Sequence, residues 1–121
     1  MNTNYIINDC GVCINPTVIF KLQKKNALAW NYVEITYAQF PNGKWDYGYS
    51  TVGGGASPCE VRAKFSTKEE AVLGAKQYLK EHLEKRIKNY ESGFMVSIHD
   101  YQYYLNEFLS FIKGEQQLSL F

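Results

Sequence analysis

The fold is decided by residues 28–52, which read LAWNYVEITYAQFPNGKWDYGYSTV. Two runs rich in β-branched and aromatic residues, 28–40 and 44–52, flank Pro41-Asn42-Gly43. Asn-Gly between such runs is the strongest short hairpin signal, because both turn residues must accept positive φ. We therefore predict an antiparallel hairpin.

With Asn42 and Gly43 as the two turn residues, the register of this hairpin follows. The predicted pairs are Phe40 with Trp45, Ala38 with Tyr47, and Thr36 with Tyr49. One face then carries aromatic side chains, namely Trp30, Tyr32, Phe40, Trp45, Tyr47 and Tyr49. The other face carries Val33, Ile35, Tyr37 and Val52, with Asp46, Gly48 and Ser50 opposite. A slip of one residue would exchange the two faces.

Two further strands are predicted around the hairpin. Residues 17–22 are β-branched and apolar, and residues 59–65 alternate between apolar and polar side chains. Residues 1–16 are predicted to be irregular, and the glycine-rich residues 53–58 are predicted to be a flexible connector.

Helical patterns fill the second half of the chain. Ser66 and Glu69 form a capping box, which predicts a helix from there to about Tyr90. Its apolar stripe is Val72, Ala75, Leu79, Leu83 and Ile87. A second helix is predicted from about Ser97 to Gly114, a natural C-terminal stop. Its apolar face is Tyr101, Tyr104, Leu105, Phe108, Leu109 and Ile112.

This order of elements predicts an α+β fold: an antiparallel β-meander of about four strands followed by two helices packed on one face. We expect a single domain over residues 1–114 and a C-terminal tail over residues 115–121.

Composition limits the classes of function. The 121 residues are 45% hydrophobic with a net charge of +1, so a large basic surface for DNA is not indicated. No secretory signal and no apolar run of about 20 residues is visible, so we expect a cytoplasmic protein without a membrane span.

No catalytic or cofactor-binding constellation is readable, and we expect neither an enzyme nor a bound cofactor. Cys10 and Cys13 form a lone Cys-x-x-Cys, and Cys59 is distant. A zinc site would need a fourth ligand, for which the sequence offers only His82 and His99. Reduced thiols without metal are the expectation. An alternative function is that of a hydrolase or nuclease, with an active site formed by residues that lie far apart in the sequence.

The last five residues carry the most specific functional signal: Gln117, Leu118, Ser119, Leu120 and Phe121. They resemble the bacterial sliding-clamp-binding motif, whose commonest form reads Gln-Leu-Ser/Asp-Leu-Phe. Four fixed positions occur by chance in roughly 1% of chains of this length, at a generous one-in-ten frequency per residue type.

The resemblance implies a partner, the bacterial DNA polymerase sliding clamp, and a role for each residue of the peptide. Gln117 would hydrogen-bond at the rim of the clamp groove, Leu118 would seat the peptide, and Ser119 would face solvent. Leu120 and Phe121 would fill the deep apolar pocket. The alternative is that the tail folds back and Phe121 packs on its own domain.

We therefore expect a clamp-docking accessory or competitor protein of DNA replication or repair, encoded by a phage or another mobile element. Recruitment of the domain to DNA predicts that the body binds nucleic acid, whereas competition with the host polymerase predicts no such binding.

An alternative function uses the aromatic sheet face. Trp45, Tyr47 and Tyr49, with Lys44 nearby, are the residue types that stack single-stranded nucleic acid. The competing interpretation is that these rings pack beneath the two helices. An uncovered sheet face would also favour a homodimer or another partner.

Overall fold

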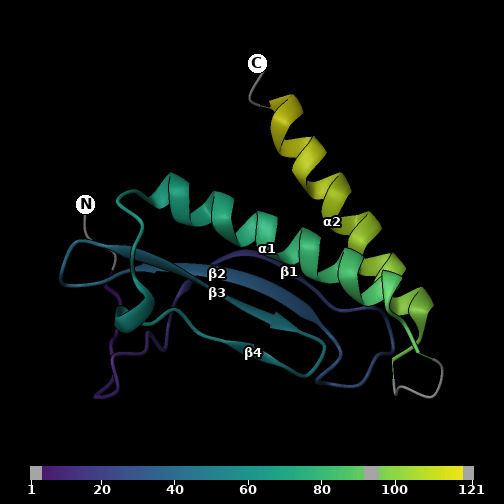
Figure 1. Cartoon of the computed structure of the whole chain (residues 1–121), viewed down its shortest axis with the longest axis horizontal. Helices are drawn as coiled ribbons and strands as arrows, with labels where there is room; N and C mark the ends of the chain where they lie inside the picture. The colour runs from purple at the N-terminus through teal and green to yellow at the C-terminus, as the bar shows by residue number, and fades with distance from the viewer. Residues whose placement is uncertain (1–3, 92–95, 119–121) are drawn as a thin grey trace.

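The computed structural model describes residues 4–91 and 96–118. It confirms the α+β class: a four-stranded antiparallel sheet, in the order β1-β2-β3-β4, is followed by two helices on one side (Figure 1). The strands are β1 Thr17–Leu22, β2 Val33–Gln39, β3 Trp45–Thr51 and β4 Gly55–Ala56. A 3-10 turn, η1 Glu60–Arg62, precedes the helices α1 Lys68–Lys88 and α2 Ile98–Leu118. No described helix is long and apolar enough to cross a bilayer.

The turn between β2 and β3 differs from the prediction. Gly43 N donates to Phe40 O at 2.8 Å, and Phe40 N donates to Lys44 O at 2.9 Å, so the loop has three residues. Gly43 has φ 83°, whereas Asn42 is not among the residues with positive φ. The Asn42 side chain instead accepts from Lys44 N at 2.9 Å. A β-turn followed by a glycine in the left-handed region is the usual three-residue hairpin loop.

This extra turn residue shifts the pairing by one position. Tyr37 pairs with Tyr47 and Ile35 with Tyr49, so the predicted register is wrong. Because side chains alternate between faces, the shift places the β3 aromatics on the same side as Val33 and Ile35. The opposite side carries small and polar side chains of both strands, namely Glu34, Thr36, Ala38, Asp46, Gly48 and Ser50.

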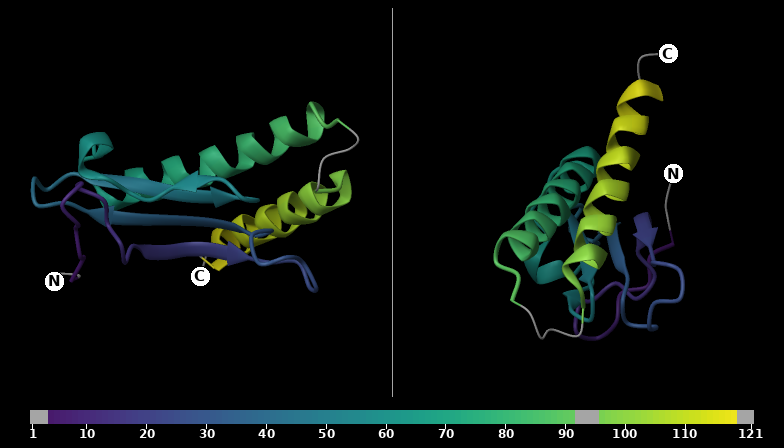
Figure 2. Two further views of the ribbon diagram at one scale, coloured as in Figure 1. Left: turned by 90° about the horizontal axis from the view of Figure 1, so that it is seen from below. Right: turned by 90° about the vertical axis from the view of Figure 1, so that its right-hand side faces the viewer.

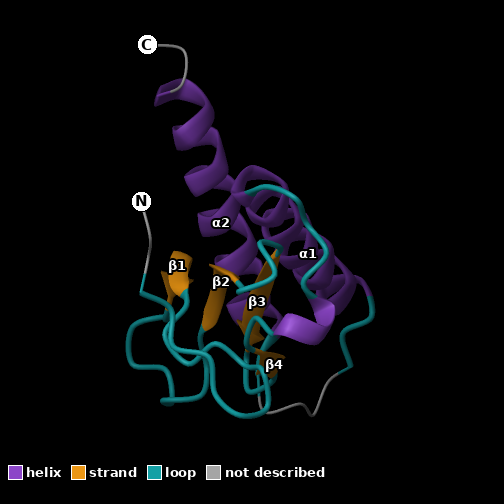
Figure 3. Cartoon of the chain, turned by 90° about the vertical axis from the view of Figure 1, so that its left-hand side faces the viewer, coloured by secondary structure: helices purple, strands orange, loops and turns teal. Residues whose placement is uncertain are grey.

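The main core lies between this aliphatic and aromatic side and the helices (Figures 2 and 3). Its fully buried members are Val33, Ile35, Ala75, Leu79, Leu83, Tyr104 and Phe108. Complete burial of a large apolar side chain is worth about 1.5–3 kcal/mol, so these contacts are the principal stabilisation of the helix layer. On the β1 side, Phe20 completes the core through ring contacts with Phe108 at 5.2 Å and Phe111 at 4.9 Å.

Helix α1 begins one residue later than predicted. Thr67, not Ser66, is the N-cap: its side chain accepts from Glu70 N, and Glu70 accepts from Thr67 N. This is the predicted capping box shifted by one position.

The predicted fourth strand over residues 59–65 is wrong. Residues 60–62 form η1, while the glycine-rich connector supplies the two-residue β4. Pro58 O accepts from Cys13 N at 2.9 Å, which joins this segment to the N-terminal residues. Gly48 makes room for it, since a methyl group there would lie 2.5 Å from Pro58 Cδ. A small second core of Cys13, Ala38 and Phe40 results on the opposite side of the sheet.

Polar contacts fix the first turn of α2 to the loop before β2. Asp100 pairs with Lys24 at 2.6 Å and accepts from Asn31 Nδ2 at 3.1 Å. The buried Tyr104 hydroxyl bonds Asn31 O and Oδ1, both at 2.8 Å. Burial alone would raise the pKa of Asp100, but hydrogen bonds from Lys24 and Asn31 and the Lys24 charge outweigh burial and lower the pKa. Asp100 therefore does more than stabilise the helix start.

The predicted stop of this helix at Gly114 is wrong, because α2 continues to Leu118. A methyl group at Gly114 would meet no atom within 4 Å. Gly114→Ala should therefore stabilise the protein by about 0.5–1 kcal/mol, because glycine in a helix interior is entropically unfavourable. Urea unfolding measures this change; destabilisation would indicate that the helix ends at Gly114.

The same substitution at Gly48 is expected to have the opposite sign. The added methyl would lie 2.5 Å from Pro58 Cδ and 2.7 Å from Ala56 O, where the backbone must shift. Overpacking of this kind costs about 1–3 kcal/mol. Unchanged stability of Gly48→Ala in the same urea assay would contradict the close approach of Pro58 to β3.

Candidate functional site

The candidate docking peptide begins within α2. Gln117 and Leu118 occupy the last turn of the helix, whereas Ser119, Leu120 and Phe121 lie outside the described residues. The sequence predicted a C-terminal tail over residues 115–121, but the backbone is helical as far as Leu118. The part of the motif that the structure places is thus helical rather than extended.

The C-terminal half of α2 leads away from the sheet (Figures 1 and 2). Glu115 Oε1 lies 2.6 Å from Lys76 Nζ on α1, which ties this part of α2 to the body. The next residues along the helix belong to the motif. A peptide that docks through residues 117–121 would consequently start two residues beyond the last described ion pair.

The end of a helix is well suited to release a short peptide. The last four carbonyl groups of a helix have no intrahelical partner, and terminal turns open at little free-energy cost. Gly114 weakens this turn further, because glycine is a poor helix former. The last turn of α2 can therefore unwind without disturbing the core residues Tyr104 and Phe108.

Trp45, Tyr47 and Tyr49 lie on the helix-covered side of the sheet. The Tyr49 ring is 4.2 Å from that of Tyr78 on α1, and the Tyr47 ring is 6.0 Å from it. Trp45 contacts Tyr37 at 6.0 Å, and its backbone pairs with Phe65. The three rings therefore pack beneath the helix layer.

Tyr78 is a member of this aromatic group that sequence analysis missed. It lies on α1 beside the predicted apolar stripe, at a position one residue before Leu79. Burial, followed by a hydrogen bond with Tyr49, raises the pKa of Tyr78 to about 12. The only sign of this contact in the sequence was an aromatic residue between Ala75 and Leu79 of the predicted apolar stripe.

The cysteines and histidines are dispersed. Cys13 is buried and burial raises the pKa of its thiol, while Cys10 is exposed. Within residues 4–91 and 96–118, no three His, Cys, Asp or Glu side chains are arranged to hold a metal ion. His82 is half-buried, and its ring stacks on that of Tyr78 with the centroids 5.7 Å apart.

No family model, no curated protein and no solved structure matches the chain. Its function is therefore inferred from the sequence of the tail and the geometry of the body.

His82 predicts a pH dependence of stability. Burial, with the charges of Arg86 and Lys85, lowers the pKa of His82 from its ordinary 6.5. A depressed pKa means that the unfolded chain binds the proton more readily, so stability is complete above 6.5 and is lost as pH falls below it. Urea unfolding at about pH 7.5 and about pH 5 should show a larger loss for the wild type than for His82→Gln. Equal losses would contradict this role of His82.

Proposed function

We propose that this chain is a sliding-clamp-docking accessory protein of DNA replication or repair, of the kind that phages and other mobile elements encode. The observation that carries the proposal is the sequence of residues 117–121, in which each position agrees with the commonest form of the clamp-binding motif. The partner is the bacterial DNA polymerase sliding clamp.

The physical chemistry of the peptide supports this partner. Leu118, Leu120 and Phe121 provide three large apolar side chains within four residues. Their burial in a groove is worth about 1.5–3 kcal/mol each. Ordering of the peptide offsets part of this free energy, so we expect micromolar affinity.

Docking in an extended conformation requires the last turn of α2 to unwind. When extended, the three residues 115–117 span about 10 Å. A peptide released beyond Gly114 therefore holds the body close to the clamp. The Lys76–Glu115 ion pair is exposed on the Glu115 side and is a weak restraint on this release. The docked peptide would fill the clamp groove, and the body would consequently cover the clamp surface around that groove.

This closeness is compatible with both roles that the motif permits. A body held at the clamp is delivered to the DNA that the clamp encircles. It also excludes any other protein that uses the same groove, including the host polymerase. Binding of nucleic acid by the body distinguishes recruitment from pure competition.

Truncation of the two apolar anchors tests the proposal. Leu120→Ala and Phe121→Ala should each weaken binding to the purified clamp by about 10-fold to 100-fold, because each removes one buried side chain. Isothermal titration measures this change. Leu28→Ala is the matched control, since Leu28 is 60% exposed on a distant loop and its loss should leave the affinity unchanged.

Two outcomes would overturn the proposal: no binding of the intact chain to the clamp, or equal binding by the intact chain and by a chain that lacks residues 117–121. Ser119→Ala provides an internal check, because a solvent-facing side chain should contribute little.

A further inference from the structure

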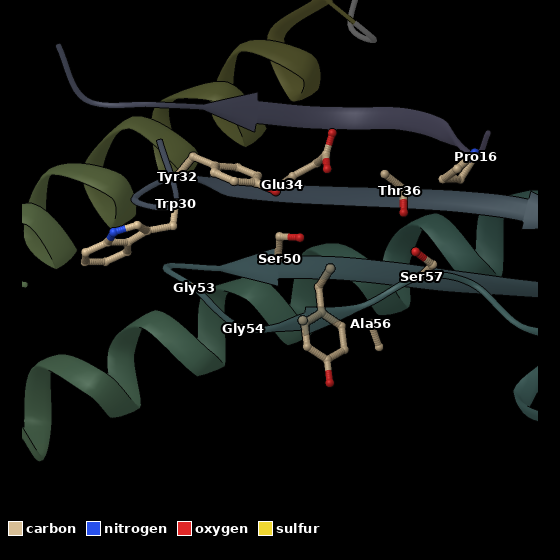
Figure 4. Close-up of a pocket in the computed structure, with 12 residues that line it drawn as sticks. Pro16, Trp30, Tyr32, Glu34, Thr36, Ser50, Gly53, Gly54, Ala56 and Ser57 are labelled. Atoms are coloured by element: carbon tan, nitrogen blue, oxygen red, sulfur yellow. The ribbon is translucent and has the colours of Figure 1, made fainter. Parts of the chain in front are cut away.

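Three neighbouring hollows lie between the open side of the sheet and the end of α1, and adjacent hollows share lining residues. The first hollow, of about 410 Å³, lies over β2 and β3 and is lined by Trp30, Tyr32 and Ser50 (Figure 4). A second hollow, of about 470 Å³, shares Trp30 and Gly53 with the first. A third, of about 390 Å³, shares Arg86 and Tyr101 with the second. We call this surface the Trp30 groove, defined by Trp30, Tyr32, Ser50, Gly53, Arg86 and Tyr101.

The aromatic rings of this groove are available to a ligand. Trp30 and Tyr32 are half-buried, and Figure 4 shows Tyr32, Glu34 and Thr36 in a row along β2 with Trp30 at its end. Tyr32 already carries a cation over its ring, since Lys21 Nζ lies 5.1 Å from the centroid. Tyr32 precedes β2 by one residue and alternates onto the side of Glu34, whereas the register of the hairpin puts Trp45, Tyr47 and Tyr49 on the side of Ile35.

A strained turn holds the groove in shape beside Trp30. Val52 has φ 51°, a value that a β-branched residue rarely adopts, and Gly53 follows with φ 92°. Val52 N donates to Tyr32 O at 2.9 Å, and Thr51 N donates to Gly54 O at 2.6 Å. A methyl group at Gly53 would lie 3.6 Å from Trp30 Cε3. Strained backbone of this kind is concentrated at binding sites.

Cations lie beside the sheet hollow and at the helix end of the groove. Lys21 lies over the Tyr32 ring, and Lys85 and Arg86 line the hollow at the end of α1. Among the described residues, the ion pairs use Lys24, Arg62, Lys76 and Lys80, so Lys85 and Arg86 have no carboxylate partner there. Burial, followed by the charges of these two cations, lowers the pKa of His82, and Glu91 lines the same hollow.

The lining chemistry favours one class of ligand. Flat rings with cations nearby match the bases and phosphates of a nucleic-acid strand. The hydroxyls of Thr36, Ser50 and Ser57 and the Glu34 carboxylate offer hydrogen bonds to base edges. A duplex does not fit this chemistry, because its bases are stacked on one another and cannot reach Trp30.

We propose that the Trp30 groove binds a short stretch of single-stranded nucleic acid, with a base stacked on Trp30 and phosphates contacted by Arg86 and Lys85. The groove is formed by described residues of the body and is separate from residues 117–121. A substitution in the groove can therefore abolish binding of nucleic acid without affecting binding to the clamp, and the reverse holds for residues 117–121.

Fluorescence anisotropy with a labelled oligothymidylate of about 12 nucleotides, at low salt and with the full chain, tests this proposal. Trp30→Ala and Arg86→Ala should each weaken binding by about fivefold to 100-fold. Arg86→Ala should also lower the slope of log K against log salt by about 0.7, which corresponds to one lost phosphate contact. Lys88→Ala and Trp45→Phe are the matched controls, because each makes a related change outside the groove.

A second readout does not require a variant of the groove. The sequence has two tryptophans, so Trp45→Phe leaves Trp30 as the fluorescent reporter, and the oligonucleotide should quench its emission. No binding by the wild type, wild-type affinity of both Trp30→Ala and Arg86→Ala, or binding without quenching would overturn the proposal. Equal affinity for a polyglutamate peptide would also overturn it, since it would indicate attraction of any polyanion.

Discussion

Gly43 holds β2 and β3 in one register, and the two faces of the molecule depend on that pairing. In this register, Val33, Ile35, Tyr47 and Tyr49 point toward the helices and form one wall of the main core. A shift by one residue would place Glu34 and Ser50 under α1 and would expose the aliphatic side chains to water. The helix layer can therefore form only on the side that this turn selects.

The same constraint separates the surfaces available for binding. The helix-covered side is occupied by core residues, whereas the other side is closed over Ala38 and Phe40 and open over Tyr32, Glu34 and Ser50. α2, whose last residues Gln117 and Leu118 begin the motif, lies on the helix side of the sheet (Figure 1). Taken together, the two proposals describe recruitment to DNA: residues 117–121 would bind the clamp, and the Trp30 groove would bind a nucleic-acid strand.

Sequence patterns were sufficient for most of the fold but not for its register. β1 and the two helices follow from β-branched runs and from apolar spacing, because these signals are local. The turn was misjudged because Asn42 bonds Lys44 N instead of adopting positive φ. The fourth strand was misplaced because the pairing of residues 58–60 with the N-terminal segment is a long-range contact that periodicity does not report. The docking peptide is a contiguous motif and is visible in the sequence, whereas the Trp30 groove combines side chains from segments more than fifty residues apart.

A competition experiment shows whether the chain occupies the clamp groove. A fluorescent peptide that carries the polymerase's own clamp-binding motif is bound to the clamp, and the full chain is then titrated in. Clamp docking predicts complete displacement of the peptide, at concentrations that match the affinity of the chain for the clamp. Unchanged fluorescence at saturating chain, with the peptide still bound, would contradict it.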